Sequence, residues 1–417
     1  MHYEMEQEEH DVYPDDPDFD INKARLVTTA PRICVRYECV PMRFIKHVYK
    51  IHTYAQDGRL FEGKTPVSAF LNSSYDGSFI AGLMELRYIQ SLPVERIINY
   101  FESHGFTLKK PTAHKLMEKA SSLFENLYKC IRQTALSDPY KAADETYYKI
   151  LVPEKNSKGK GFRKGYLWVV VGINTRMIYL LYDDGSRSEK VILNELGGCK
   201  GIIQSDGYSP YRKLESDAYP HITRIPCLQH IKRKFIDCGE DDPDAKRIVE
   251  MINTLYQNEH KHKIGVDGWT VEQNLVHRKK YAPDILGEIK DVLDDIEERG
   301  DLLPKSELKE AITYLRNEWN AVVDIFNYGD TYLDNNIVER MNRYISLSRK
   351  NSLFFGSHKG AERGAILYTI ALTCRMNKVN LFEYLTDIIN RTAEWQPNTP
   401  LEKYRQLLPD RWEKAND

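Results

Sequence analysis

The spacing of apolar residues changes along the chain and divides its first part into two regions. Between Arg32 and His52 apolar and polar residues alternate, which predicts two or three strands broken near Pro41. From residue 77 to 120 apolar residues recur at helical spacing, in three segments separated at Pro93 and Gly105. Two helices, a short turn and a basic helix are typical of a helix-turn-helix, but a structural or dimerising bundle has the same outline.

From Ala142 the pattern becomes α/β. Three strands are expected first, then a helix over Glu189–Leu196, and the later strands lead into a helix over Gln229–Asp237. The expected strands are Ala142–Val152, Gly165–Asn174, Met177–Tyr182, Gly201–Ser205 and Thr223–Leu228. This order predicts an α/β ribonuclease-H-like (retroviral-integrase-like) catalytic core. Long amphipathic helices then interrupt the core, and helices return over Ala361–Met376 and Leu381–Arg391.

These changes predict seven consecutive segments. They are an acidic lead (1–24), a small β-rich region (25–70), a helical helix-turn-helix-like region (71–135), a first core part (138–240), a helical insertion (241–330), a second core part (331–376) and a helical tail (377–417).

Composition limits the class of protein. With 417 residues, 41% of them hydrophobic, the chain can bury sizeable cores, and its net charge is −2. Seven cysteines without a CxxC pair, an acidic start and no long apolar run predict a cytoplasmic protein with no membrane span and no disulfide framework. Basic residues concentrate at Lys155–Lys164 and His230–Lys234, and such local patches set affinity for phosphate.

Three acidic residues are the candidates for catalysis. Asp144 lies in the first core strand, in AADET, and Asp206 directly follows the fourth, in IIQSDGY. These strands are neighbours in a ribonuclease-H-like sheet, so both carboxylates can reach one cation, which would offset their mutual repulsion. The alternative is that each aspartate is a turn or cap residue, since Asp206-Gly207 is common turn chemistry.

Glu339 is expected on a helix that starts at Asp334–Asn336, which offer capping side chains. Ile337, Met341 and Ile345 would form its apolar face, with Glu339 and Arg343 off that face beside Asn342. A surface ion pair between Glu339 and Arg343 explains the spacing as well as metal binding does. The basic residues nearby favour a phosphate-handling surface; they are Arg340, Arg343, Arg349 and Lys350.

The chemistry of these three acids favours hard divalent cations. Two Mg²⁺ ions per active site, with Mn²⁺ as a substitute, suit phosphoryl transfer on nucleic acid. Cys227 and His230 form a CxxH pair at a strand–helix junction. Zinc would need two further ligands, so a buried cysteine with a polar histidine, or a His230 beside the substrate, are alternatives.

The motifs resemble a known family. The segments AADETYYKIL, GYLWVVVG, IIQSDGYSPY, CLQHIKRKF, YLDNNIVERMNRYISLSRKNSLFFGSHKGAERGAILYTI and CRMNKVNLFEYLTDII are similar to bacterial transposases of the insertion-sequence 66 family, in the DDE superfamily. The resemblance implies a ribonuclease-H-like core, a catalytic and metal-binding triad of Asp144, Asp206 and Glu339, and a Ser352–Arg363 stretch lining the active site. It also implies a zinc finger upstream, for which this chain lacks the cysteine pairs.

The resemblance implies metal-dependent end cleavage and strand transfer of an insertion sequence, by a protein associated with the nucleoid. The expected partners are DNA, as terminal inverted repeats and target, further copies of the chain, and accessory proteins of the element. Residues expected to contact DNA are Arg343, Arg349, Lys350, Lys232, Arg233, Lys115 and Lys119. A metal-dependent nuclease on the same core, and a non-catalytic DNA-binding regulator derived from a transposase, are the alternatives.

Overall fold

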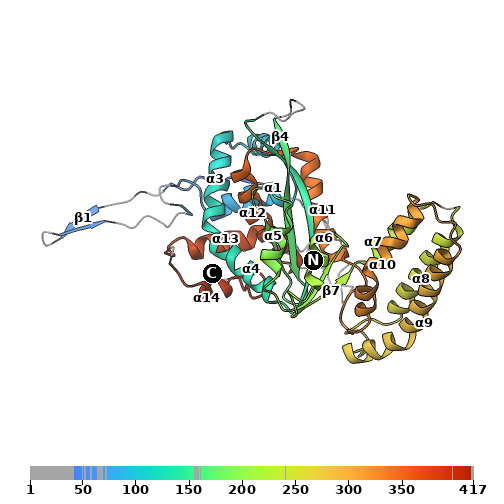
Figure 1. Ribbon diagram of the computed structural model, residues 1–417. Coiled ribbons are helices and arrows are strands. Elements are labelled where there is room, and N and C mark those ends of the chain that lie inside the picture. Colours follow the sequence, from blue (N-terminus) through green and yellow to red (C-terminus); the bar gives the residue numbers. More distant parts are fainter. Residues whose placement is uncertain are drawn as a thin grey trace, which may run out of the picture.

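A mixed sheet forms the centre of the molecule (Figure 1). The computed structural model describes residues 42–48, 50, 53–56, 59–62, 69–70, 73–154, 159, 161–239, 241–396 and 398–414. The sheet order is β5 (Met177–Leu181), β4 (Phe162–Gly172), β3 (Tyr140–Leu151), β6 (Gly201–Ser205) and β7 (Ile222–Pro226). The first three strands are antiparallel, whereas β6 and β7 run parallel to β3. A short β8 (Phe354–Phe355) pairs with the distal end of β3.

The α/β expectation is confirmed, and the five main strands lie within a few residues of their expected bounds. Residues 167–171 of β4 are fully buried, because helices pack over the sheet. The helices in contact with β5 are α4 (Glu125–Ser137) and α12 (His358–Met376). Helix α5 (Glu189–Leu196) connects β5 to β6, and α6 (Ser209–Arg212) with a short 3₁₀ turn (Lys213–Glu215) connects β6 to β7.

The N-terminal helices pack against the C-terminal ones. Helix α1 (Gly77–Tyr88) lies along α13 (Leu381–Thr392), and α14 (Leu401–Arg405) contacts α4. Helices α2 (Val94–Ser103) and α3 (Lys110–Leu123) complete the group, so the three helical segments expected over residues 77–120 are confirmed.

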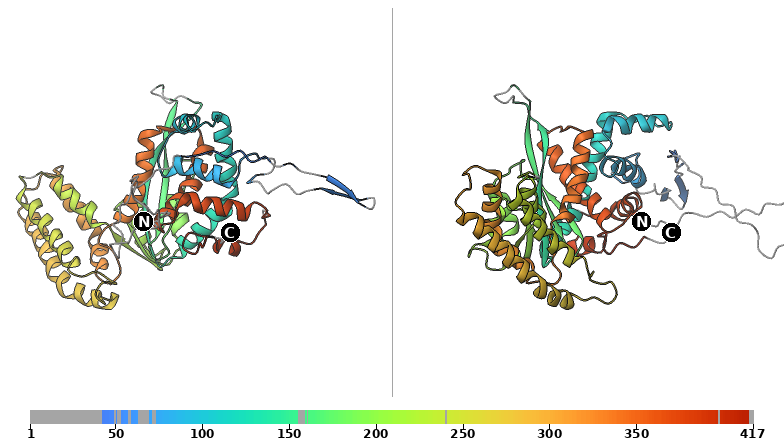
Figure 2. Two further views of the ribbon diagram at one scale, coloured as in Figure 1. Left: turned by 180° about the vertical axis from the view of Figure 1, so that it is seen from behind. Right: turned by 90° about the vertical axis from the view of Figure 1, so that its right-hand side faces the viewer.

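The segment between β7 and α11 (Asn336–Asn351) is helical in its described residues. It contains α7 (Leu228–Ile236), α8 (Pro243–Glu259), α9 (Val271–Glu298) and α10 (Glu307–Ile325). These helices bury a hydrophobic cluster distinct from the main core, and α10 also contacts β7. They lie on one side of the sheet while α1 and α13 lie on the other (Figure 2).

The expectation of strands between Arg32 and His52 is wrong in the part that the structure describes. Residues 42–48 and 50 carry no strand, and the antiparallel pair β1 (Thr53–Gln56) and β2 (Arg59–Glu62) lies further along the chain. Alternation alone names no pairing partner, so it cannot fix where strands form. The acidic lead and residues 25–41 lie outside the described residues. The place of a second zinc-finger cysteine pair reads KIHTYAQDG, and its described part includes β1. No helix in the described part is both long and apolar enough to cross a membrane.

Candidate active site

Asp144 on β3 and Asp206, the residue directly after the neighbouring parallel strand β6, lie at the same level. The last matched pair of β3 and β6 is Ala142 with Gln204, and each aspartate comes two residues later. Asp206 Oδ1 also accepts a hydrogen bond from the Tyr208 amide at 3.1 Å, so this residue makes the turn contact that was the alternative expectation. Turn formation and closeness to Asp144 therefore occur together.

The carboxyl group of Asp144 is held by two donors. Its Oδ1 accepts from the Glu145 amide at 2.8 Å, and its Oδ2 accepts from Asn342 Nδ2 at 2.6 Å. Burial raises the pKa of Asp144 to about 8, and the negative charges of Glu145 and Asp206 add to this rise. A carboxyl group with so high a pKa favours a proton, or a cation that replaces it, near neutral pH.

Glu145 faces a different set of partners. Its carboxylate pairs with Arg187 at 2.6 Å, and that guanidinium lies over the ring of Tyr208, 4.2 Å from the centroid. Burial raises the pKa of Glu145, and the ion pair with Arg187 opposes the rise. Sequence reasoning missed this acid, although it adjoins Asp144.

Helix α11 lies along β3 and is fixed to it at three levels. Asn335 Nδ2 donates to the Ala143 carbonyl at 2.9 Å, Asn342 donates to Asp144, and the Arg349 guanidinium donates to the Tyr147 carbonyl. Arg349 also lies 3.9 Å from the centroid of the Tyr147 ring. The helix that carries Glu339 is thereby aligned with the strand that carries Asp144.

Two details of the α11 expectation are corrected. The buried residues are Val338, Asn342, Ile345 and Ser348, whereas Ile337 and Met341 are only partly buried. Asn342 belongs to the buried face because Asp144 accepts its hydrogen bond. The helix starts at Asn336 as expected, and Asp334 Oδ1 accepts from the Asn336 backbone amide at 3.1 Å. The N-cap residue Asn335 makes no side-chain capping bond, and its side-chain amide donates to the Ala143 carbonyl.

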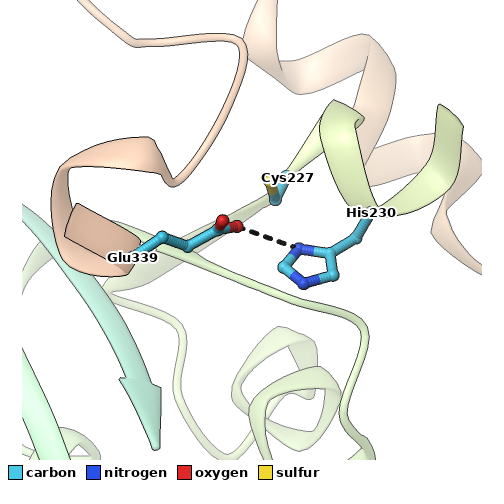
Figure 3. Close-up of side chains that lie close together, drawn as sticks. All are labelled: Cys227, His230 and Glu339. Atoms are coloured by element: carbon cyan, nitrogen blue, oxygen red, sulfur yellow. Dashed lines mark ion pairs between the residues drawn. The ribbon is translucent and has the colours of Figure 1, made fainter. Parts of the chain in front are cut away.

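Glu339 points toward the start of α7. Its Oε1 lies 3.7 Å from His230 Nδ1, and the ligand atoms of Cys227, His230 and Glu339 all lie within 4.8 Å of one another (Figure 3). We call these three residues the Cys–His–Glu cluster. Among the described residues, Asp144, Asp206 and Glu339 do not form a group of that tightness. Glu339 therefore lies beside His230, and among the described residues no ion pair joins Glu339 to Arg343.

The segment after β6 is held by the helical insertion. Buried Arg224 of β7 donates to the Asp206 carbonyl at 2.8 Å and to Glu318 of α10 at 2.5 Å. The Gly207 amide donates to the Tyr314 hydroxyl at 2.8 Å, and a Cβ on Gly207 would lie 2.4 Å from that oxygen. Sequence reasoning missed these contacts. A lone arginine within the apolar run ITRIP was the available indication.

The basic residues expected to contact DNA differ in exposure. Arg343, Lys350, Arg233 and Lys115 are exposed, and Lys232 is partly buried. Lys119 lies 5.4 Å from the Phe70 ring centroid, and Arg349 is engaged by β3 as described above. Their role in binding DNA stays a prediction.

Comparison with known proteins gives a consistent result. A family model described as "Transposase IS66 family" matches residues 72–363. Three uncharacterized proteins of Sinorhizobium fredii are similar over much of the chain. Protein y4jD is 25% identical over 346 residues, covering 80% of this chain and 65% of its own length. Protein y4hP is 24% identical, covering 95% and 76%, and y4qI is 26% identical, covering 88% and 69%. The chain thus spans just under two thirds of y4jD.

Proposed function

The chain belongs to the IS66 family of transposases, and we propose that it is a DNA transposase whose catalytic residues are Asp144, Asp206 and Glu339. The observation that carries the proposal is the alignment of β3, β6 and α11. Asp144 and Asp206 share one level of the sheet, and α11 is hydrogen-bonded to Asp144 one helical turn beyond Glu339. The mixed order of three antiparallel and two parallel strands supports a ribonuclease-H-like core.

The residues fit a pair of hard divalent cations. Carboxylate oxygens are the ligands that Mg²⁺ prefers, and the raised pKa of Asp144 marks a place where positive charge is favoured. When bound, two Mg²⁺ ions, or Mn²⁺ in their place, would stabilise charge on the attacking and leaving oxygens of an in-line displacement. Asp144, Asp206 and Glu339 would hold them.

The chain's own residues would prepare this site. The insertion fixes the Asp206–Gly207 backbone through Arg224, Glu318 and Tyr314, while Asn342 orients the Asp144 carboxylate. Preorganised groups of this kind need little rearrangement when charge develops. The reaction would hydrolyse a phosphodiester at the element's end to release a 3′-hydroxyl. That hydroxyl would then displace a phosphodiester oxygen of the target DNA.

The partners in this proposal are the terminal inverted repeats and target DNA. Pairing two element ends favours an assembly of several copies of the chain on DNA, with accessory proteins of the element as further candidates. Exposed Arg343 and Lys350, on the same helix as Glu339, would contact phosphates near the cut.

The test uses purified protein, labelled terminal-repeat DNA and a target plasmid with Mg²⁺ or Mn²⁺. Wild type should cleave and join, whereas Asp206→Asn should lose at least about 1,000-fold in rate, because losing a metal ligand costs several kcal/mol at the transition state. Asp217→Asn, at an exposed aspartate, is the matched control and should retain activity. Cleavage without joining would favour the nuclease alternative, and binding without cleavage the regulator.

A further inference from the structure

The Cys–His–Glu cluster is built from two rigid elements. Cys227 is the N-cap residue of α7, and His230 lies within the first turn of that helix. Glu339 reaches them from the first turn of α11. Two hydrogen bonds join the two helix starts directly. The Asn335 backbone amide donates to Cys227 Sγ at 3.2 Å, and the Leu228 backbone amide donates to the Leu333 carbonyl at 2.9 Å. The three side chains therefore converge from backbones that are held in place.

The distances suit an ion between the side chains better than direct contact. The 3.7 Å from His230 Nδ1 to Glu339 Oε1 is too long for a hydrogen bond. Around a tetrahedral zinc ion, with bonds of about 2.0 to 2.3 Å, neighbouring ligand atoms lie roughly 3.3–3.6 Å apart. The observed spacing, with all three ligand atoms within 4.8 Å, needs only small side-chain shifts to reach this arrangement.

Two of the candidate ligand atoms have no hydrogen-bond partner. Within the described residues, His230 Nδ1 and Glu339 Oε1 are buried and unpaired, as is Oδ1 of Asn335, whose backbone amide donates to Cys227 Sγ. Buried polar atoms without partners are rare and indicate an unseen water or ion. A thiol and an imidazole beside a carboxylate form a softer ligand set than Mg²⁺ prefers, and this set favours a transition metal.

We propose that Cys227, His230 and Glu339 bind one transition-metal ion of the zinc class, with the fourth coordination position open. Binding would release the thiol proton to solvent as the sulfur becomes a ligand. An ion held there would keep the Glu339 carboxylate with Cys227 and His230, and so withhold it from Asp144 and Asp206. This second step rests on the proposed function, whereas the metal site itself does not.

Cobalt provides the direct test, because a thiolate bound to Co²⁺ gives a charge-transfer absorption band. The full chain, stripped of metal with a chelator, should develop this band at one equivalent of Co²⁺, and Zn²⁺ should abolish it. Cys227→Ser should remove the band. His230→Gln should weaken Co²⁺ binding at least about tenfold, because mutating even a residue that only supports a metal ligand lowers metal affinity by about tenfold or more.

The control is Cys238→Ser, at a half-buried cysteine just after the end of α7. It should keep the band, and circular dichroism should show that every variant is folded. Absence of the band in wild type would overturn the metal site. Retention of the full band in folded Cys227→Ser would do the same, since other cysteines would then be the ligands.

A second measurement separates the two steps. For wild type and each variant, the rate of Mg²⁺-dependent DNA cleavage with one equivalent of Zn²⁺ is divided by the rate without Zn²⁺. The wild-type rate should fall at least about tenfold, and the ratio should move toward one in His230→Gln, whose metal site is weakened. An unchanged wild-type ratio beside a clear cobalt band would overturn the withholding of Glu339. Absence of all cleavage would count against the proposed function and leave the cobalt result standing.

Discussion

Replacing Asp144 with asparagine should stabilise the metal-free protein while removing its activity. The carboxyl group of Asp144 has a pKa of about 8, compared with an ordinary value of 3.8. Between these values the unfolded chain binds fewer protons than the folded one, so stability falls as pH rises through this window. Asparagine does not titrate, and it can keep both contacts if Asn342 turns its amide, because Asn342 Oδ1 has no partner.

The size of the effect follows from the pKa difference. Each pH unit inside the window lowers the free energy of unfolding of wild type by at most about 1.4 kcal/mol. Between pH 5 and pH 7 the loss is therefore at most about 2.7 kcal/mol. The Asp144 side chain is only partly buried, so screening by solvent reduces this loss of unfolding free energy to roughly 1–2 kcal/mol. A chain of 417 residues has an unfolding entropy of about 0.9 kcal/mol/K, so the melting temperature of Asp144→Asn relative to wild type should be about 1–2 °C higher at pH 7 than at pH 5.

Thermal unfolding with a chelator present, at pH 5, 6, 7 and 8, measures the difference between Asp144→Asn and wild type. The exposed Asp183→Asn serves as the matched control and should show no pH-dependent gain. Saturating Mg²⁺ should shrink the gap, because the ion binds wild type and stabilises it. A gain of equal size at pH 5 and pH 8, or a loss at every pH, would refute the argument that Asp144 carries a burial penalty.

Three further changes test neighbouring contacts. Gly207→Ala should cost about 1–3 kcal/mol in thermal unfolding, because its Cβ would lie 2.4 Å from the Tyr314 hydroxyl and 2.6 Å from a ring carbon of Tyr314; combined with Tyr314→Ala, it should cost less than the sum of the two single changes. Glu318→Gln removes one of the two carboxylates paired with the buried Arg224 cation and leaves Glu215 as the other, so it should destabilise the protein by less than the about 3–5 kcal/mol of a fully unpaired buried charge, measured by thermal unfolding. Lys350→Ala should lower the slope of log affinity for DNA against log salt by about 0.9 without changing the melting temperature; an unchanged slope would place Lys350 outside the DNA interface.

The sequence was sufficient to predict the elements that carry the candidate acids. Strand periodicity placed Asp144 inside the first core strand and Asp206 directly after the fourth, as the structure shows. Periodicity was less accurate for the helix of Glu339, where the buried face includes Asn342. A polar residue that is buried to bind another polar residue does not appear in an apolar pattern.

Contacts between distant segments could not be predicted from local patterns. One partner of Arg224 is Glu318, on a helix of the insertion, and no spacing rule connects the two. The same limit applied to Cys227 and His230. A search for further zinc ligands near them in the chain finds none, because the third member of the cluster is Glu339 of α11. Only the fold brings these residues together.

The two proposed cation sites are connected by the position of Glu339. Its helix is fixed to β3 through Asn335 and Asn342, so the backbone cannot move far. A glutamate side chain has three rotatable torsions before its carboxylate, so it can turn between neighbouring groups while its backbone stays in place. Without metal, Asp144 carries a burial penalty and Glu339 Oε1 lacks a hydrogen bond. Either kind of ion would relieve part of this cost, and the relative concentrations of the two ions would then decide whether Glu339 completes the catalytic site.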